Sequence, residues 1–168
     1  YASALAVTVF GLADGQFSLV LLAASAVAVT TSVGFGILAD QRANRRGIAL
    51  ATGLSLTLGT ALMVLAPGPG AFVLAHGLFL PLSSAIFGQV FALARLAATL
   101  HPEADRPAIQ STLRALFALP WVMVLPVWAW VFRGGARLTL VYPVCLVCAV
   151  ALLVLCWLFW PRDGATRW

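Results

Sequence analysis

The chain has 168 residues, of which 62% are hydrophobic and only 9% are charged, whereas a soluble domain carries roughly a quarter charged residues. This composition excludes a soluble globular fold, because one core cannot bury so much apolar surface. With a mean hydropathy of +1.03, the chain is expected to lie in a lipid bilayer. The net charge of +5 does not indicate a nucleic-acid partner, because the arginines are scattered between apolar runs and form no continuous basic face.

Five apolar runs are each long enough to cross a bilayer as a helix. In chain order they are residues 17–39, 47–66, 71–98, 108–132 and 138–160. Residues 1–12 are apolar but too short to cross, so we interpret them as the end of a truncated first span. Glycine, proline and charged residues separate most runs, at levels where water can reach irregular backbone. The sequence therefore predicts an all-α membrane protein in which residues 1–168 form one six-helix unit, about half the size of a typical secondary transporter.

The arginines between the runs predict the orientation. One side collects Arg42, Arg45, Arg46, Arg106, Arg162 and Arg167, and the other side has Arg133 and Arg137. Because basic residues concentrate on the cytoplasmic side of membrane proteins, we expect a multi-pass protein of the cell inner (plasma) membrane whose C-terminal end is cytoplasmic.

Small residues predict where helices approach closely, since helix packing in lipid depends on short side chains. The first complete run carries Gly34 and Gly36, and the second carries Gly53, Ser55 and Gly59. The fifth run lacks a comparable stripe and is rich in Leu and Val, so we expect it to face lipid.

The connection between the first two complete runs reads GILADQRANRRGIAL over residues 36–50. It resembles the signature loop of the major facilitator superfamily, Gly-x-Leu-Ala-Asp-Arg-x-Gly-Arg-Arg. The matching positions are Gly36, Leu38, Ala39 and Asp40 and, with one residue inserted, Arg42, Asn44 in place of Gly, Arg45 and Arg46. The resemblance implies a charge network that holds one access state closed. The expected residues of this conformational latch are Gly36, Asp40, Arg42, Arg45 and Arg46.

A second stretch is similar to the fourth and fifth helices of the bacterial sugar efflux transporters. It reads QVFALAR over residues 89–95 and STLRALFALPWVMVLP over residues 111–126. Val124 and Leu125 replace the Gly-Pro of that family, so the helix bend at this point is altered. The resemblance implies a major-facilitator-type six-helix half bundle that is the N-terminal half of a transporter. A small-molecule substrate is then expected to bind between this half and a C-terminal half, with export by alternating access.

Candidate substrate contacts lie in the third and fourth runs. Arg114 follows Arg106 by eight residues, which places it about 12 Å along the helix from the membrane edge, a depth at which a charge facing lipid is costly. Gln110, Arg114 and Trp121 share one helix face by spacing. In the preceding run, Gln89 and Ser84 offer further polar groups.

Other charged and reactive residues receive different interpretations. We expect Arg95 to pair with Glu103 or Asp105 and to order the loop between them. Cys145 and Cys148 form a Cys-x-x-Cys inside an apolar run without further ligands, so we expect neither a metal nor a cofactor. Motifs of hydrolases, metalloproteases and lipid phosphotransferases are absent from the sequence, so we do not expect an enzyme.

Two alternatives to a sugar exporter remain open at this point. A drug or multidrug exporter of the same superfamily has a more apolar cavity. A non-transporting membrane receptor or assembly subunit keeps the fold without a route for a solute. The sequence identifies neither the substrate nor a coupling ion, since no acidic residue lies inside a complete run.

Overall fold

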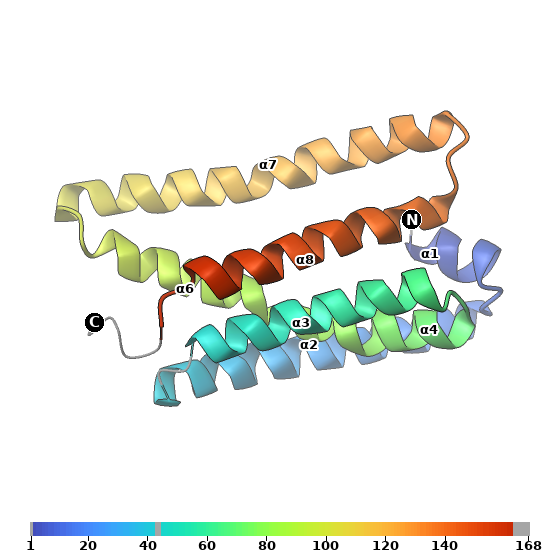
Figure 1. Ribbon diagram of the computed structural model, residues 1–168, viewed down its shortest axis with the longest axis horizontal. Coiled ribbons are helices and arrows are strands. Elements are labelled where there is room, and N and C mark those ends of the chain that lie inside the picture. Colours follow the sequence, from blue (N-terminus) through green and yellow to red (C-terminus); the bar gives the residue numbers. More distant parts are fainter. Residues whose placement is uncertain (1, 43–44, 163–168) are drawn as a thin grey trace. The chain divides into compact units, whose positions relative to one another are not determined.

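The computed structural model describes residues 2–42, except the side chain of Arg42, and residues 45–162 (Figure 1). Tyr1, Asn44 and Arg167, which entered the sequence argument, lie outside these ranges. Every regular element in the described ranges is a helix. Five segments are long and apolar enough to cross a membrane: Asp14–Gln41, Arg45–Leu65, Pro69–Ala98, Glu103–Arg133 and Leu138–Phe159. The five predicted runs are therefore confirmed as helices, and the chain has the character of a multi-pass membrane protein.

The described chain forms two compact units, one comprising residues up to Gln89 together with those from Thr139 onward, the other comprising residues 90–138. The first unit contains α1 (Ala2–Ala4), η1 (Leu5–Val9), α2 (Asp14–Arg42), α3 (Arg45–Leu65), α4 (Pro69–Leu74), η2 (Ala75–Phe79), α5 (Leu80–Ser83) and α8 (Val141–Phe159). The second contains η3 (Glu103–Asp105) and α7 (Arg106–Arg133). Helix α6 (Ala85–Ala98) and the short η4 (Leu138–Leu140) lie at the two joins.

Local signals fix where the first helices begin. The backbone N–H of Ala13 donates to Oε1 of Gln16 at 3.0 Å, which is the reciprocal half of a capping box and satisfies an amide at the start of α2. Gly11 precedes it with φ +67°, a conformation that glycine adopts without strain. Pro69 occupies the first position of α4, where a missing N–H costs nothing.

The third span is an irregular helix rather than a uniform one. A π-helical turn, η2, precedes Pro81, and the helix breaks at Ser84 before α6 begins. Proline lacks an N–H and its ring crowds the preceding turn, so the chain widens there. Pro120 and Pro126, by contrast, lie inside α7, which stays α-helical throughout.

An aromatic cluster around Phe72 forms the core of the first unit at one end. Phe72 is fully buried, its ring centroid lies 5.4 Å from that of Phe10 and 6.5 Å from that of Phe17, and it stacks on His76 at 4.0 Å. Tyr142 meets the edge of His76 at 5.9 Å. The cluster joins the N-terminal segment to α2, α4 and α8, so the residues before α2 are an integral part of this unit.

Helix α3 packs closely through the small residues that the sequence indicated. A Cβ atom at Gly59 would lie 2.8 Å from Cβ of Phe79, and one at Gly53 would lie 3.2 Å from Cδ1 of Leu153. Ser55 donates to the backbone carbonyl oxygen of Phe79 at 2.8 Å. The expectation of close packing is therefore confirmed for α3.

At Gly34 and Gly36 of α2 the same expectation is wrong, because nothing lies within 4 Å of a Cβ built at either position in the described structure. The fifth run, which we expected to face lipid, also contacts protein along one side. Helix α8 lies alongside α3 (Figure 1) and buries Ala149 and Cys156. These two small residues are seven positions apart and so share one helix face. They provide the stripe that the sequence reading missed.

Candidate functional site

The second unit is a helical hairpin whose loop is closed by one arginine. Arg106, at the first position of α7, donates from Nε to the carbonyl oxygen of His101 at 3.1 Å and from Nη2 to that of Thr99 at 3.2 Å. Both carbonyls lie in the turn that follows α6. Carbonyl groups at the end of a helix have no backbone amide of that helix to accept from. Arg106 therefore fixes the return of the chain from α6 into α7.

A pocket of about 180 Å³ with a mixed polar and apolar lining lies between α6 and α7 within this unit. Its lining residues are Phe91, Ala94 and Arg95 from α6 and Gln110, Leu113 and Arg114 from α7. Gln110 and Arg114 are one helical turn apart and also line a wider surface hollow of about 520 Å³, together with Arg106 and Ser111. The two helices thus contribute two arginines and one glutamine to the lining of one pocket.

An aromatic pair lies on the side of the pocket that is farther from the loop. The ring of Phe91 meets the ring of Phe117 edge-on, with centroids 5.2 Å apart and planes at 67°, a geometry that aromatic pairs favour. Phe117 follows Arg114 by three residues, so it continues the same face of α7. The pocket therefore has a basic part near the loop and an apolar part beyond it.

The chemistry of the lining favours solutes with oxygen acceptors. Guanidinium groups donate hydrogen bonds and carry fixed positive charge, and the amide of Gln110 both donates and accepts. The pocket lining contains no aspartate or glutamate. Hydroxyl, carboxylate or phosphate oxygens are the natural partners of such a set.

The structure brings together some of the predicted contacts and separates others. Arg114 and Gln110 share the pocket as expected. Trp121 does not line either hollow and is 65% exposed, because seven residues of helix carry it about 10 Å past Arg114. Shared periodicity places these residues on one face of α7, but it does not limit their separation along the helix axis.

Gln89 and Ser84 belong to the first unit, where Gln89 is buried and Ser84 is partly exposed. Gln89 is only 4% exposed, and its buried Oε1 has no hydrogen-bond partner among the described residues. The hydroxyl of Ser84 donates to the carbonyl oxygen of Pro81 at 2.6 Å, which satisfies it within its own helix. Their assignment to a substrate cavity stays a prediction.

Arg95 is a pocket residue that the sequence analysis assigned to another role. It forms no ion pair with Glu103 or Asp105 in the described part of the chain, so the expected loop-ordering pair is not present. Instead it faces the same space as Arg114. The sequence signal for this position is the four-residue spacing between Phe91 and Arg95, which puts the two side chains on one face of α6.

One ion pair is present among the described residues of the predicted latch loop. Nη2 of Arg45 lies 2.7 Å from Oδ1 of Asp40, linking the end of α2 to the start of α3. Arg46 contacts α8: its Nη2 donates to the backbone carbonyl oxygen of Trp157 at 2.7 Å. The side chain of Arg42 lies outside the described residues, and Gly36 is a helical residue with open space beside it.

No family model, no curated protein and no solved structure matches this chain.

Proposed function

We propose that this chain is the N-terminal six-helix half of a secondary transporter of the major facilitator type. In this proposal it exports sugars or other small polar solutes by alternating access. Support comes from the motif-like loop between α2 and α3 and from five helices long enough to span a bilayer.

The observation that carries the proposal is the pocket that contains Arg95, Gln110 and Arg114. Arg114 lies about 12 Å along α7 from Arg106, inside a segment of high hydropathy. A guanidinium at that depth is stable only where protein or water surrounds it. A water-filled route for a polar solute meets that requirement. It also fits the hydrogen-bond donors of Arg95, Gln110 and Arg114 in the pocket lining.

The ion pair between Asp40 and Arg45 supports the alternating-access part of the proposal. An exposed pair adds little to stability, but a pair made in one state and broken in another biases the equilibrium between the two. The pair connects the ends of two consecutive spanning helices, where such a bias acts on their relative position.

The proposal also implies a second half that completes the route. Along α7 many apolar side chains are half or more exposed, among them Leu119, Val122 and Met123. In a membrane such surface is covered either by lipid or by another helix. The partner half contributes the remaining wall of the substrate site, as in other transporters built from repeats.

The test is flux of labelled solutes into sealed vesicles that contain the complete gene product. Arg114→Ala is expected to reduce flux at least tenfold at equal protein abundance, and Arg133→Ala, at the far end of α7, is the matched control. Competition by sugars rather than by lipophilic cations separates this function from drug export. Absence of flux for every solute and imposed gradient overturns the proposal and favours a receptor or assembly subunit.

A further inference from the structure

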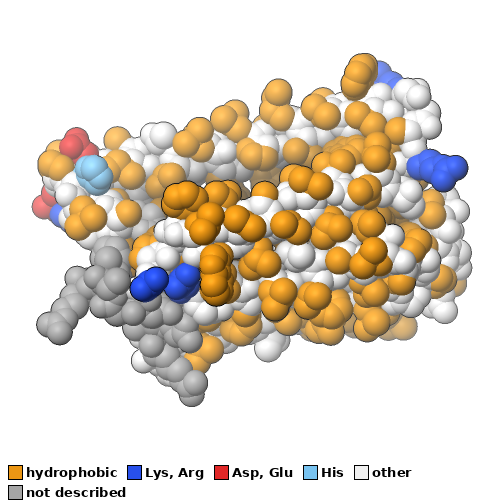
Figure 2. Space-filling view, in the orientation of Figure 1, with side chains coloured by type: hydrophobic (Ala, Val, Ile, Leu, Met, Phe, Trp, Pro, Cys, Tyr) orange, Lys and Arg blue, Asp and Glu red, His pale blue; other side chains and the backbone are white. Residues whose placement is uncertain are grey.

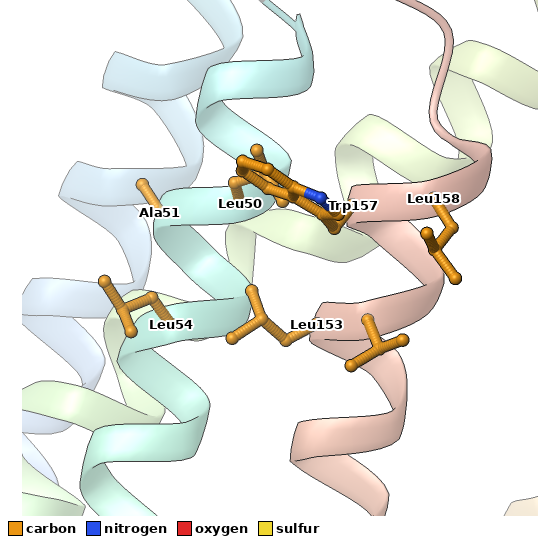
Figure 3. Close-up of a pocket in the computed structure, with 7 residues that line it drawn as sticks. Leu50, Ala51, Leu54, Leu153, Trp157 and Leu158 are labelled. Carbon is orange, nitrogen blue, oxygen red and sulfur yellow. The ribbon is translucent and has the colours of Figure 1, made fainter.

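Helices α3 and α8 leave an apolar groove along one part of their length. The groove has a volume of about 440 Å³ and is lined by apolar side chains only, among them Leu50, Leu54, Leu153 and Trp157. Figure 3 shows the Trp157 ring lying across the space between the two helices, beside Leu50. Arg46 precedes Leu50 by one turn of α3, so a basic residue lies next to this end of the groove.

The basic end carries more positive than negative charge. Arg46 lies against Trp157, with its guanidinium carbon 5.4 Å from the ring centroid. Arg45 precedes it, and Arg162 follows three residues after the end of α8. In the sequence, Asp40, which pairs with Arg45, and Asp163, which follows Arg162, supply two negative charges against these three positive ones. In Figure 2 basic side chains border the apolar surface beside the end of α8.

The groove covers only part of one leaflet of a bilayer. Its lining on α3 runs from Leu50 to Leu54, which is about 6 Å along the helix, whereas half of a hydrocarbon core is about 15 Å. Tryptophan side chains concentrate at the level where headgroups meet hydrocarbon, and Trp157 lies at the basic end. The groove therefore begins at headgroup level and follows the hydrocarbon inward.

We infer that this groove binds one acyl chain of an anionic phospholipid whose headgroup lies against Arg45, Arg46 and Arg162. The apolar lining matches a hydrocarbon chain, and the excess of positive charge selects an anionic headgroup over a zwitterionic one. The close approach of Gly53 to Leu153, where an added Cβ would come within 3.2 Å, narrows the gap between the helices beside the groove. The site does not depend on transport, only on the embedding of α3 and α8 in lipid.

The test measures quenching of Trp157 by lipids with brominated acyl chains. The full chain is reconstituted in phosphatidylcholine vesicles with Trp121, Trp128, Trp130, Trp160 and Trp168 replaced by Phe. Brominated phosphatidylglycerol is expected to quench Trp157 at a mole fraction about fivefold or more below that needed for brominated phosphatidylcholine.

Two variants separate the headgroup from the acyl chain. Arg45→Gln with Arg162→Gln leaves the contact between Arg46 and Trp157 in place, and it is expected to remove the preference for phosphatidylglycerol. Arg133→Gln with Arg137→Gln removes the same charge elsewhere and is expected to keep it. Ala51→Phe, which fills the groove, is expected to weaken quenching by both lipids.

Three outcomes overturn the inference. Equal quenching by the two lipids shows ordinary solvation by the bilayer. A preference that survives Arg45→Gln with Arg162→Gln shows that these arginines do not select the headgroup. Absence of quenching by either lipid in a dimeric protein shows that a second copy covers the groove.

Discussion

Arg46 supplies a hydrogen bond to Trp157 that the chain of α8 cannot make for itself. The carbonyl oxygen of Trp157 would normally accept from the backbone amide four residues later, and that residue is Pro161, which has no N–H. Nη2 of Arg46 donates to this oxygen at 2.7 Å. An arginine that the motif resemblance assigns to a latch therefore also caps the end of a distant helix.

Loss of this cap is expected to destabilise the first unit. Arg46→Ala removes a hydrogen bond from a charged donor and a cation–π contact, which together are worth about 2 kcal/mol. Thermal unfolding in detergent, followed by helical circular dichroism, should show a lower midpoint for this variant than for the unaltered chain.

Arg45→Ala is the control for that measurement, because it removes the same charge one residue away. Its partner Asp40 is 74% exposed, so the loss is expected to stay below about 1 kcal/mol. Equal midpoints for the two variants would contradict the capping role of Arg46.

Close packing of α3 against η2 predicts that even a methyl group at Gly59 is harmful. The Cβ of Gly59→Ala would come within 2.8 Å of Cβ of Phe79, an atom near the backbone that cannot rotate away. Overpacking of this kind costs about 1–3 kcal/mol, and the same unfolding experiment measures it. Gly34→Ala is the control, because nothing lies within 4 Å of a Cβ at this position, and its midpoint should be unchanged or higher. An equal fall of the midpoint in the two variants would show that the cost at Gly59 does not come from its contact with Phe79.

The spans were predictable from sequence because each is a long apolar run between polar breaks. In lipid, such a run forms a helix, because a helix makes all its backbone hydrogen bonds internally. Gly53 and Gly59 were predictable as packing sites for a similarly local reason. Which helix each of them meets was not predictable. The partners Leu153 and Phe79 depend on how helices distant in sequence are arranged.

The pocket was predictable only in part for the same reason. Gln110 and Arg114 lie one turn apart on α7, so spacing placed them together. Arg95 comes from another helix, and its position opposite Arg114 depends on the register of α6 against α7. Nothing in the local pattern sets that register, which is fixed by the Phe91–Phe117 contact and the loop closure through Arg106.

The ion pair of the loop is expected to protect the chain from cleavage rather than to stabilise the fold. Asp40→Asn removes the partner of Arg45 and should raise the initial rate of tryptic cleavage at Arg45 or Arg46 by up to about fivefold. This limit corresponds to the roughly 1 kcal/mol that exposed pairs contribute. Cleavage is measured on the full chain in vesicles.

A charge exchange is the control for this effect. Asp40→Arg with Arg45→Asp restores an opposite-charge pair and is expected to return the rate toward that of the unaltered chain. An unchanged rate in Asp40→Asn, or a rate in the exchanged variant as high as in Asp40→Arg alone, would show that the pair does not order the loop.

The two faces of α7 are expected to differ in their access to water. Leu113 lines the pocket with Arg114, whereas Ala115 is outside both hollows and lies about 3 Å farther along the axis. Single cysteines at these positions, in a chain whose Cys145, Cys148 and Cys156 are replaced by Ala, can be reacted with a membrane-impermeant thiol reagent. Leu113→Cys should react at least about tenfold faster in vesicles, because only a hydrated thiol ionises readily.

This pair of positions is informative because exposure alone predicts the opposite order. Ala115 is exposed and Leu113 only partly so, so after denaturation or in an aqueous setting Ala115→Cys should react at least as fast. A bilayer reverses the order only if lipid covers the Ala115 face while water enters the pocket beside Arg114. Equal rates in intact vesicles would place Arg114 on a lipid-covered face and remove the physical basis for a polar route along α7.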